Sequence, residues 1–201
     1  MGPLHPIGLS RAAALTVLGL ALAMVPGQGR EPMKPGKVGE VQVRVVEGYP
    51  AAESVFKGDV AEDWPTGFRR CARYVKFAGD EIRLPVIVNY PDWKDGEPAT
   101  PTTLTVHLMM DPSGRFPMPR EKDIGVVEVP ELTVVSYAFQ GAYDFENQKQ
   151  ALEKIRAYMK EKNIPAIGPP RTLYYSNVDW TMSIFLVGEV QVPVPPQERK
   201  L

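Results

Sequence analysis

The stretch Gly67-Phe68-Arg69-Arg70-Cys71-Ala72-Arg73-Tyr74-Val75 predicts the first helix of this protein and, with it, the plan of the fold. Its apolar residues recur at helical spacing; they are Phe68, Cys71, Ala72 and Val75. This spacing predicts an amphipathic helix with one buried face. Asp63 and Pro65 are typical of a helix start, the first as a cap and the second as a first-turn proline.

Strand-like runs flank this helix, two before it and two after it, and the same order returns about eighty residues later. The first copy has strand patterns at 41–47, 51–57, 82–90 and 102–110. The second has them at 124–129, 132–140, 172–175 and 184–193, around a helix capped by Asp144. A repeated unit must bury its sheet face, and the other copy is the natural partner. We therefore predict an α+β fold of duplicated β-α-β-β units, forming a mostly antiparallel sheet or a flattened barrel with two outer helices and a ligand cleft between the halves.

The start of the chain has the proportions of a secretory signal peptide. Arg11 precedes an uncharged, mostly apolar run at 12–25, and small residues surround a possible cleavage point after Gly29. We expect residues 1–29 to be removed and the protein to be exported, either periplasmic or secreted, without a stable membrane span. A cut after Ala23, or an uncleaved anchor, remains an alternative.

The rest of the chain divides into three parts. Residues 30–40 are rich in proline, glycine and charge and are predicted to be a linker. A ligand-binding domain is expected at 41–194, with its two copies at 41–110 and 123–194. Residues 195–201 are predicted to be a flexible tail.

The composition excludes several functions. The 201-residue chain has a formal net charge of −1, so no basic excess favours nucleic acid. Cys71 is the only cysteine and lies on the apolar face of its helix, where a thiol stays protonated. Beyond the signal peptide, His107 is the only histidine, and no nucleophile elbow or phosphate-binding loop is present. We therefore predict a binding protein and not an enzyme.

Five motifs in order resemble those of the SOUL heme-binding family. The opening strand is Val43-Arg44-Val45-Val46-Glu47-Gly48-Tyr49-Pro50, and the helix is the stretch quoted above. The later motifs are Pro117-Met118-Pro119 before Asp123-Ile124, Ser136-Tyr137-Ala138-Phe139-Gln140-Gly141, and Phe185-Leu186-Val187-Gly188-Glu189-Val190. This resemblance implies a hydrophobic cleft beside the helix with basic residues near the heme propionates. The related GyrI-like effector-binding domains share the duplicated architecture and bind other small molecules.

The helix offers the best candidate site. Heme is a flat apolar ring with two carboxylates, so its site needs an apolar wall and cations at the rim. Candidates for these roles on the helix are Phe68, Arg69, Arg73, Tyr74 and Lys76. The alternative is an ordinary solvated helix face.

Two strands supply further candidates. His107 is a candidate axial ligand of heme iron, with Met109 as a neighbouring soft alternative, although the pattern favours a solvated or hydrogen-bonded strand histidine at His107. Glu189 can point into a GyrI-like cleft and pair with a cationic ligand, or lie at a sheet edge. We predict an exported, non-covalent binder of heme or another tetrapyrrole that acts as a carrier or buffer. The alternatives are a binder of a cationic or amphipathic molecule, and a hydrolase that uses Glu189.

Overall fold

The computed structural model describes residues 33–58, 60–90, 93–94, 97–98, 102–176 and 186–196. It confirms the α+β class, with two helices and an eight-stranded antiparallel sheet. The predicted signal peptide at 1–29 lies outside the described residues, as do Phe185 of the last motif and most of the predicted tail.

The first half contains the elements that the repeat predicts, with an added hairpin. Its elements are β1 (Val41–Val46), β2 (Tyr49–Gly58), α1 (Val60–Phe77), β3 (Val86–Asn89), the hairpin strands β4 (Trp93–Lys94) and β5 (Glu97–Pro98), and β6 (Thr102–Met109). Helix α1 begins at Val60, three residues before the predicted cap Asp63, so Pro65 lies inside the helix.

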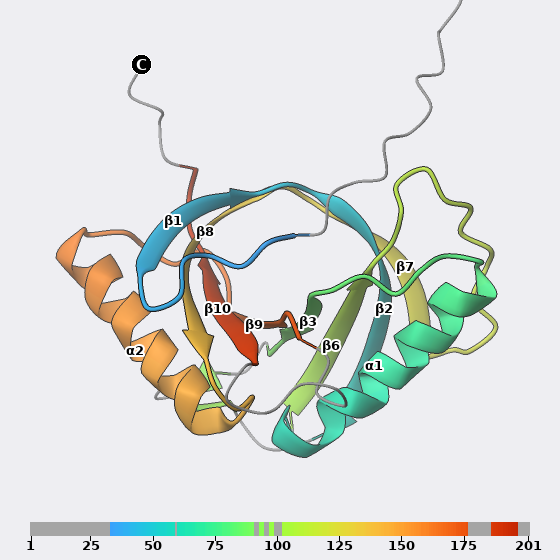
Figure 1. Ribbon diagram of the computed structural model, residues 1–201, viewed down its shortest axis with the longest axis horizontal. Helices are drawn as coiled ribbons and strands as arrows, with labels where there is room; N and C mark the ends of the chain where they lie inside the picture. The colour runs from blue at the N-terminus through green and yellow to red at the C-terminus, as the bar shows by residue number, and fades with distance from the viewer. Residues whose placement is uncertain are drawn as a thin grey trace, which may run out of the picture.

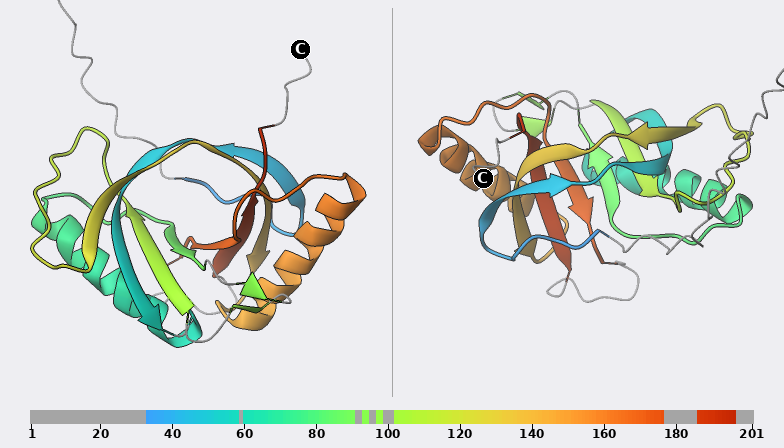
Figure 2. Two further views of the ribbon diagram at one scale, coloured as in Figure 1. Left: turned by 180° about the vertical axis from the view of Figure 1, so that it is seen from behind. Right: turned by 90° about the horizontal axis from the view of Figure 1, so that it is seen from above.

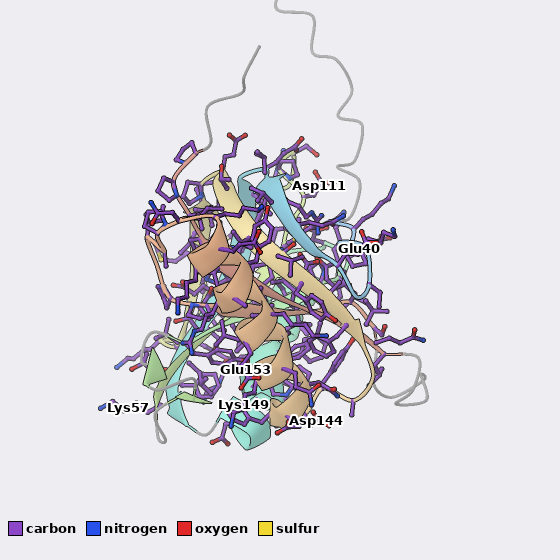
Figure 3. The ribbon with its side chains drawn as sticks, turned by 90° about the vertical axis from the view of Figure 1, so that its left-hand side faces the viewer. Glu40, Lys57, Asp111, Asp144, Lys149 and Glu153 are labelled. Atoms are coloured by element: carbon purple, nitrogen blue, oxygen red, sulfur yellow. The ribbon has the colours of Figure 1, made fainter. Side chains whose placement is uncertain are left out.

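The described part of the second half repeats the order of the main strands and the helix. Its elements are β7 (Ile124–Val129), β8 (Leu132–Gln140), α2 (Phe145–Glu161), β9 (Arg171–Tyr174) and β10 (Val187–Pro193). The Asp144 carboxylate accepts a hydrogen bond of 2.9 Å from the backbone N–H of Asn147, which confirms the predicted cap of α2. Figure 3 shows Asp144 at the start of α2, with Lys149 and Glu153 farther along the helix.

The strand order of the sheet is β1-β8-β10-β9-β3-β6-β2-β7. This order is symmetric about the β9–β3 pair when β1 is equated with β7, β2 with β8, β3 with β9 and β6 with β10. The duplication therefore exists in three dimensions. The two edge strands β1 and β7 do not pair with each other, so the sheet is open and the flattened barrel is not formed.

The first strand of each half pairs with a strand of the other half. Strand β1 pairs with β8, and β7 pairs with β2. The segment around Gly48 carries the chain from one half of the sheet to the other, because β2 already has β6 and β7 on its two edges.

Both helices cover the same face of the sheet, one on each half (Figures 1 and 2). Helix α1 packs on Leu104, Val106 and Leu108 of β6, all of which are fully buried. A Cβ on Gly67 would lie 2.6 Å from Cγ2 of Val106, so only glycine allows this close approach of α1 to the sheet.

No helix covers the opposite face among the described residues, yet that face is buried. Ile87 of β3 and Leu173 of β9 are paired at the junction of the two halves and are both 0% exposed. The curvature of the sheet explains this burial, because the strands from the two edges arch over the face (Figure 1). The region between the halves is therefore largely filled by side chains, and we call this side the inner face.

Candidate functional site

The pseudo-symmetry of the sheet places two of the predicted residues at equivalent positions. Glu189 of β10 lies opposite Leu173, and His107 of β6 lies opposite Ile87. Since Leu173 and Ile87 are themselves paired, the four residues form one row across the inner face. Glu189 and His107 stand at the ends of this row, three strand spacings or roughly 14 Å apart along the sheet.

Glu189 is fully buried and its carboxylate is held from several directions. Nη1 of Arg44 donates to Oε1 at 2.9 Å and to Oε2 at 3.1 Å. The side-chain amide of Gln191 donates to Oε1 at 2.9 Å, and the hydroxyl of Tyr175 donates to Oε2 at 3.1 Å. A buried carboxylate requires such partners. We expected a cationic ligand to supply the charge, and the chain supplies it through Arg44.

The same cluster continues into a second arginine. Nε of Arg171 donates to Oε1 of Gln191 at 2.9 Å, while Nη2 of Arg171 and the hydroxyl of Tyr49 have no hydrogen-bond partner among the described residues. Burial raises the pKa of Tyr49, and the nearby Arg171 guanidinium opposes this shift. Burial, followed by the charge of Glu189, raises the pKa of Tyr175, so both phenols stay protonated at neutral pH.

The segment predicted as a linker contacts this cluster. The backbone N–H of Gly36 donates to Oε2 of Glu189 at 2.9 Å, and the carbonyl of Lys34 accepts from Nη2 of Arg44 at 2.7 Å. A Cβ on Gly36 would lie 2.9 Å from Oε1 of Gln42, so this segment lies directly against β1. Glu189 therefore has no solvent access here and no free oxygen with which to activate water, which argues against a hydrolase that uses it.

His107 is bonded within the chain as well. Its Nε2 lies 2.9 Å from Oε2 of Glu53 on β2, and this hydrogen bond lowers the pKa of Glu53. Its Nδ1 is buried and has no partner among the described residues. Met109 is 5% exposed and packs among apolar residues of the inner face. The described residues contain no cluster of three or more His, Cys, Asp or Glu that could hold a metal ion.

The predicted helix residues form a groove on the other face. This groove has a volume of about 480 Å³ and is mostly apolar. Its lining residues are Thr66, Phe68, Arg69, Arg70, Ala72, Arg73, Lys76 and Ile82. Four of the five predicted helix candidates are in this set. We call it the α1 groove.

The cations of the α1 groove are only loosely held. Nη2 of Arg69 donates to the hydroxyl of Thr66 at 3.0 Å, and Nη2 of Arg73 lies 3.5 Å from Oε2 of Glu121. The Arg73 and Glu121 side chains are 67% and 49% exposed, so this ion pair is weak. The guanidinium groups can therefore turn toward an anionic ligand at little cost.

Tyr74, the fifth helix candidate, has a different role. It is 6% exposed and belongs to the core under α1. Its hydroxyl donates to the carbonyl of Pro117 at 2.6 Å and so fixes the loop between β6 and β7 beside the helix. Burial raises the pKa of the neighbouring Cys71 to about 12, so its thiol is not a nucleophile.

The structure separates the predicted heme site into two parts. Along β6, Leu104, Val106 and Leu108 face α1, whereas His107 and Met109 face the other way. One heme molecule cannot contact both the α1 groove and His107, because the sheet lies between them. The groove lining contains no histidine, cysteine or methionine, so it offers no axial ligand for iron.

The most important residue that sequence reasoning missed is Arg44. It lies in the quoted opening-strand motif, but that motif was used only to recognise the family. A usable signal existed, since a carboxylate predicted to point inward requires a cation, and Arg44 is one of two arginines in the predicted strands.

Comparison with known proteins identifies the family. The family model described as SOUL heme-binding protein matches residues 33–193. The chain belongs to the SOUL heme-binding family. No curated protein matches the chain by sequence. The SOUL match starts at Met33 and thus includes the segment that contacts Glu189.

Solved structures show that this SOUL protein shares its fold with several other proteins. The C-terminal domain of EcmrR superposes with a TM-score of 0.64 at 15% identity, covering 79% of this chain and 98% of that domain. An uncharacterised conserved protein from Listeria innocua has a TM-score of 0.60 at 12% identity and covers 77% of this chain and 92% of its own. A protein described as a hydrolase from Listeria innocua has a TM-score of 0.56 at 12% identity, with 77% and 91% covered. At these identities the likeness concerns the fold alone.

Proposed function

We propose that this SOUL protein binds heme or another tetrapyrrole non-covalently in the α1 groove. The observation that carries the proposal is the combination of a mostly apolar groove of about 480 Å³ with cations at its edge. In this arrangement the flat ring packs against Phe68, Ala72 and Ile82. The two propionates are bound by Arg73 and Lys76, with Arg69 nearby.

The proposed site recognises the organic part of the ligand and not its metal. Nitrogen and sulfur ligands for iron are absent from the groove lining, and His107 lies on the inner face. Binding therefore depends on ring stacking and on propionate charge. A bound heme would keep its iron available to a ligand from solution or from a partner protein, which suits a carrier or a buffer better than an electron-transfer protein.

A titration with three porphyrins tests this function. Heme and metal-free protoporphyrin IX are expected to bind with similar affinity, whereas protoporphyrin IX dimethyl ester, whose propionates are blocked, binds at least tenfold more weakly. The measurement is the shift of the Soret band, or the quenching of tryptophan fluorescence, against ligand concentration. Saturable binding of heme with no binding of protoporphyrin IX would contradict recognition through the ring and propionates.

Substitutions locate the site. Replacing both Arg73→Ala and Lys76→Ala is expected to weaken heme binding about a hundredfold or more, because each substitution removes a charge-assisted contact worth about 1.4 kcal/mol or more. The matched control is Lys154→Ala with Lys160→Ala on α2, which removes the same charge from the other half. His107→Ala is expected to leave the Soret shift unchanged. Loss of binding in His107→Ala but not in the α1 variant would overturn the placement of the site.

Export is a separate part of the proposal. Its support is the sequence pattern at 1–29, and the resulting protein would carry or buffer its ligand outside the cytoplasm. Expression of the full chain followed by N-terminal sequencing of the product tests it. A product that begins at Arg30 or Met24 supports export, and an intact leader on a cytoplasmic product contradicts it.

A further inference from the structure

Two apolar side chains protrude beside the C-terminal end of α1. Phe77, the last residue of α1, is 52% exposed, and Met118 in the loop between β6 and β7 is 88% exposed. Figures 1 and 2 show this loop lying beside the end of α1. The hydrogen bond from Tyr74 to the carbonyl of Pro117 holds the loop against the helix, so Met118 is directed outward from a fixed base.

The surface around these side chains is strongly basic. Segments 69–77 and 115–123 contain seven basic and two acidic residues, although the whole chain has a net charge of −1. Both acids have basic partners, since Glu121 lies near Arg73 and Asp123 lies 3.5 Å from Arg70. The guanidinium of Arg120 lies over the Phe77 ring at 5.1 Å from its centroid, so the cation and the apolar ring are stacked on one another.

A single shallow groove joins the two segments. It has a volume of about 240 Å³ and is lined by Arg73, Tyr74, Phe77, Pro119, Arg120, Glu121 and Ile124. Arg73 also lines the α1 groove, so the two grooves are adjacent. We call the surface formed by Phe77, Met118, Arg120 and the neighbouring cations the basic-apolar surface.

We propose that the basic-apolar surface docks the protein on an anionic lipid bilayer. Protruding apolar side chains ringed by lysine and arginine are suited to an interface where the side chains enter the headgroup region and the cations meet lipid phosphates. A folded protein partner would require a complementary cavity for Met118. A bilayer requires none, because lipids rearrange around the inserted side chain.

The purpose of this docking rests on the proposed function, although its evidence does not. An apolar tetrapyrrole partitions into membranes, and a carrier must collect or deliver it there. With the basic-apolar surface on the lipid, the α1 groove lies beside the headgroups, so its ligand can pass between groove and bilayer without crossing water. Within the described residues no helix is long and apolar enough to span a membrane.

Vesicle sedimentation tests the proposal. The protein used begins at Arg30, which removes the apolar leader and retains every described residue. It is expected to sediment with vesicles of phosphatidylglycerol and phosphatidylcholine in equal parts, and not with phosphatidylcholine alone. The variant Met118→Glu with Arg120→Glu is expected to bind at least tenfold more weakly, because it reverses one charge and replaces the apolar tip. Circular dichroism checks that the variant is folded.

The matched control carries the same changes on the other half. Ile167 is 59% exposed and Lys160 is exposed in the last turn of α2, so Ile167→Glu with Lys160→Glu alters charge and apolar exposure equally. This control is expected to bind vesicles like the unaltered protein. Equal weakening of both variants would overturn the proposal in favour of non-specific attraction. Failure of the unaltered protein to sediment would also overturn it, and binding to soluble polyglutamate in that case would assign the surface to an acidic polypeptide.

Heme titration of the same variants separates the two proposals. Neither Met118 nor Arg120 lines the α1 groove, so the Met118→Glu with Arg120→Glu variant is expected to bind heme normally in solution. Vesicle binding without heme binding would remove the proposed function and leave the docking surface. Heme binding without vesicle binding would remove the docking surface and leave the proposed function.

Discussion

The two halves of this SOUL protein each hold an ionisable residue at the same point of the sheet, but the burial and the hydrogen bonding of that residue differ between the halves. Glu189 is 0% exposed and bound by Arg44, Gln191, Tyr175 and the backbone of the N-terminal segment. His107, its equivalent, is 9% exposed and is bound by Glu53 through one hydrogen bond. The duplicated scaffold fixes where such a residue stands, whereas the partners of that residue differ between the halves. Strand β1 brings Arg44 toward Glu189, whereas β7 places Gly125, which has no side chain, opposite Glu53.

The outer faces differ as well. On α1 the exposed side is basic and bears the α1 groove, while α2 mixes both signs, as with Lys149 and Glu153 (Figure 3). The two halves therefore differ: one has a heavily hydrogen-bonded interior, and the other bears the α1 groove on its outer surface. Three substitutions test this difference, from the largest expected effect to the smallest.

Arg44→Met is expected to have the largest effect, because it leaves the Glu189 carboxylate buried without a charged partner. Breaking a buried ion pair in this way costs about 3–5 kcal/mol of the free energy of unfolding. Urea denaturation measures the loss. Adding Glu189→Leu to Arg44→Met is expected to restore most of the stability, since an apolar side chain needs no counter-charge. A loss below about 1 kcal/mol for Arg44→Met alone would show that the pair is not buried in solution.

Gly67→Ala is expected to have an intermediate effect that is specific to the first half. The new Cβ would meet Val106 at 2.6 Å and Phe56 at 2.7 Å, so α1 must move away from the sheet at a cost of about 1–3 kcal/mol. Thermal or urea unfolding measures it. The control is Gly125→Ala, where the nearest atom is 3.8 Å away, and a change within about 0.5 kcal/mol is expected there. Equal effects at both glycines would contradict the close packing of α1.

Glu53→Gln is expected to have the smallest effect, and one that depends on pH. The hydrogen bond with His107 lowers the pKa of Glu53 below its ordinary value of 4.5. The stability from this pair is therefore present above about pH 4.5 and is lost as pH falls through the lowered pKa. Since the pair is partly exposed, we expect about 1 kcal/mol or less. Unfolding measured from pH 7 to pH 3 should show a steeper acid loss in the unaltered protein than in Glu53→Gln, and parallel curves would contradict the pairing.

The sequence predicted the helices and strands of this fold better than it predicted which strands pair. Alternation of Val41, Val43 and Val45 predicts a half-buried strand, and β1 is a strand there, but Val45 is 51% exposed and Val46 on the opposite face is buried. Alternation does not say which strand lies alongside, because any strand with a matching apolar face satisfies it. The pairing of β1 with β8 and of β7 with β2 was therefore not predictable from the pattern.

In the candidate site, too, the sequence predicted the residues of one element better than their position relative to another element. Helical spacing grouped Phe68, Arg69, Arg73 and Lys76 correctly, because residues three and four apart share a face of a helix. It could not place His107 relative to that group, since this requires knowing which face of β6 the helix covers. Alternate residues of a strand face opposite sides of the sheet. Once Leu104, Val106 and Leu108 are assigned to the face under α1, His107 must therefore lie on the other face.

The exchanged edge strands have a consequence for the way the protein is made. Val43 of β1 pairs with Val135 of β8, which is synthesised 92 residues later. Until then the first half has an unpaired strand at its start, and the place that β7 will occupy on β2 is empty. Contacts so distant in sequence slow folding and keep a strand edge available to other chains. An unfinished copy is thus open to pairing with a second one, and completion of the second half is the step that ends this risk.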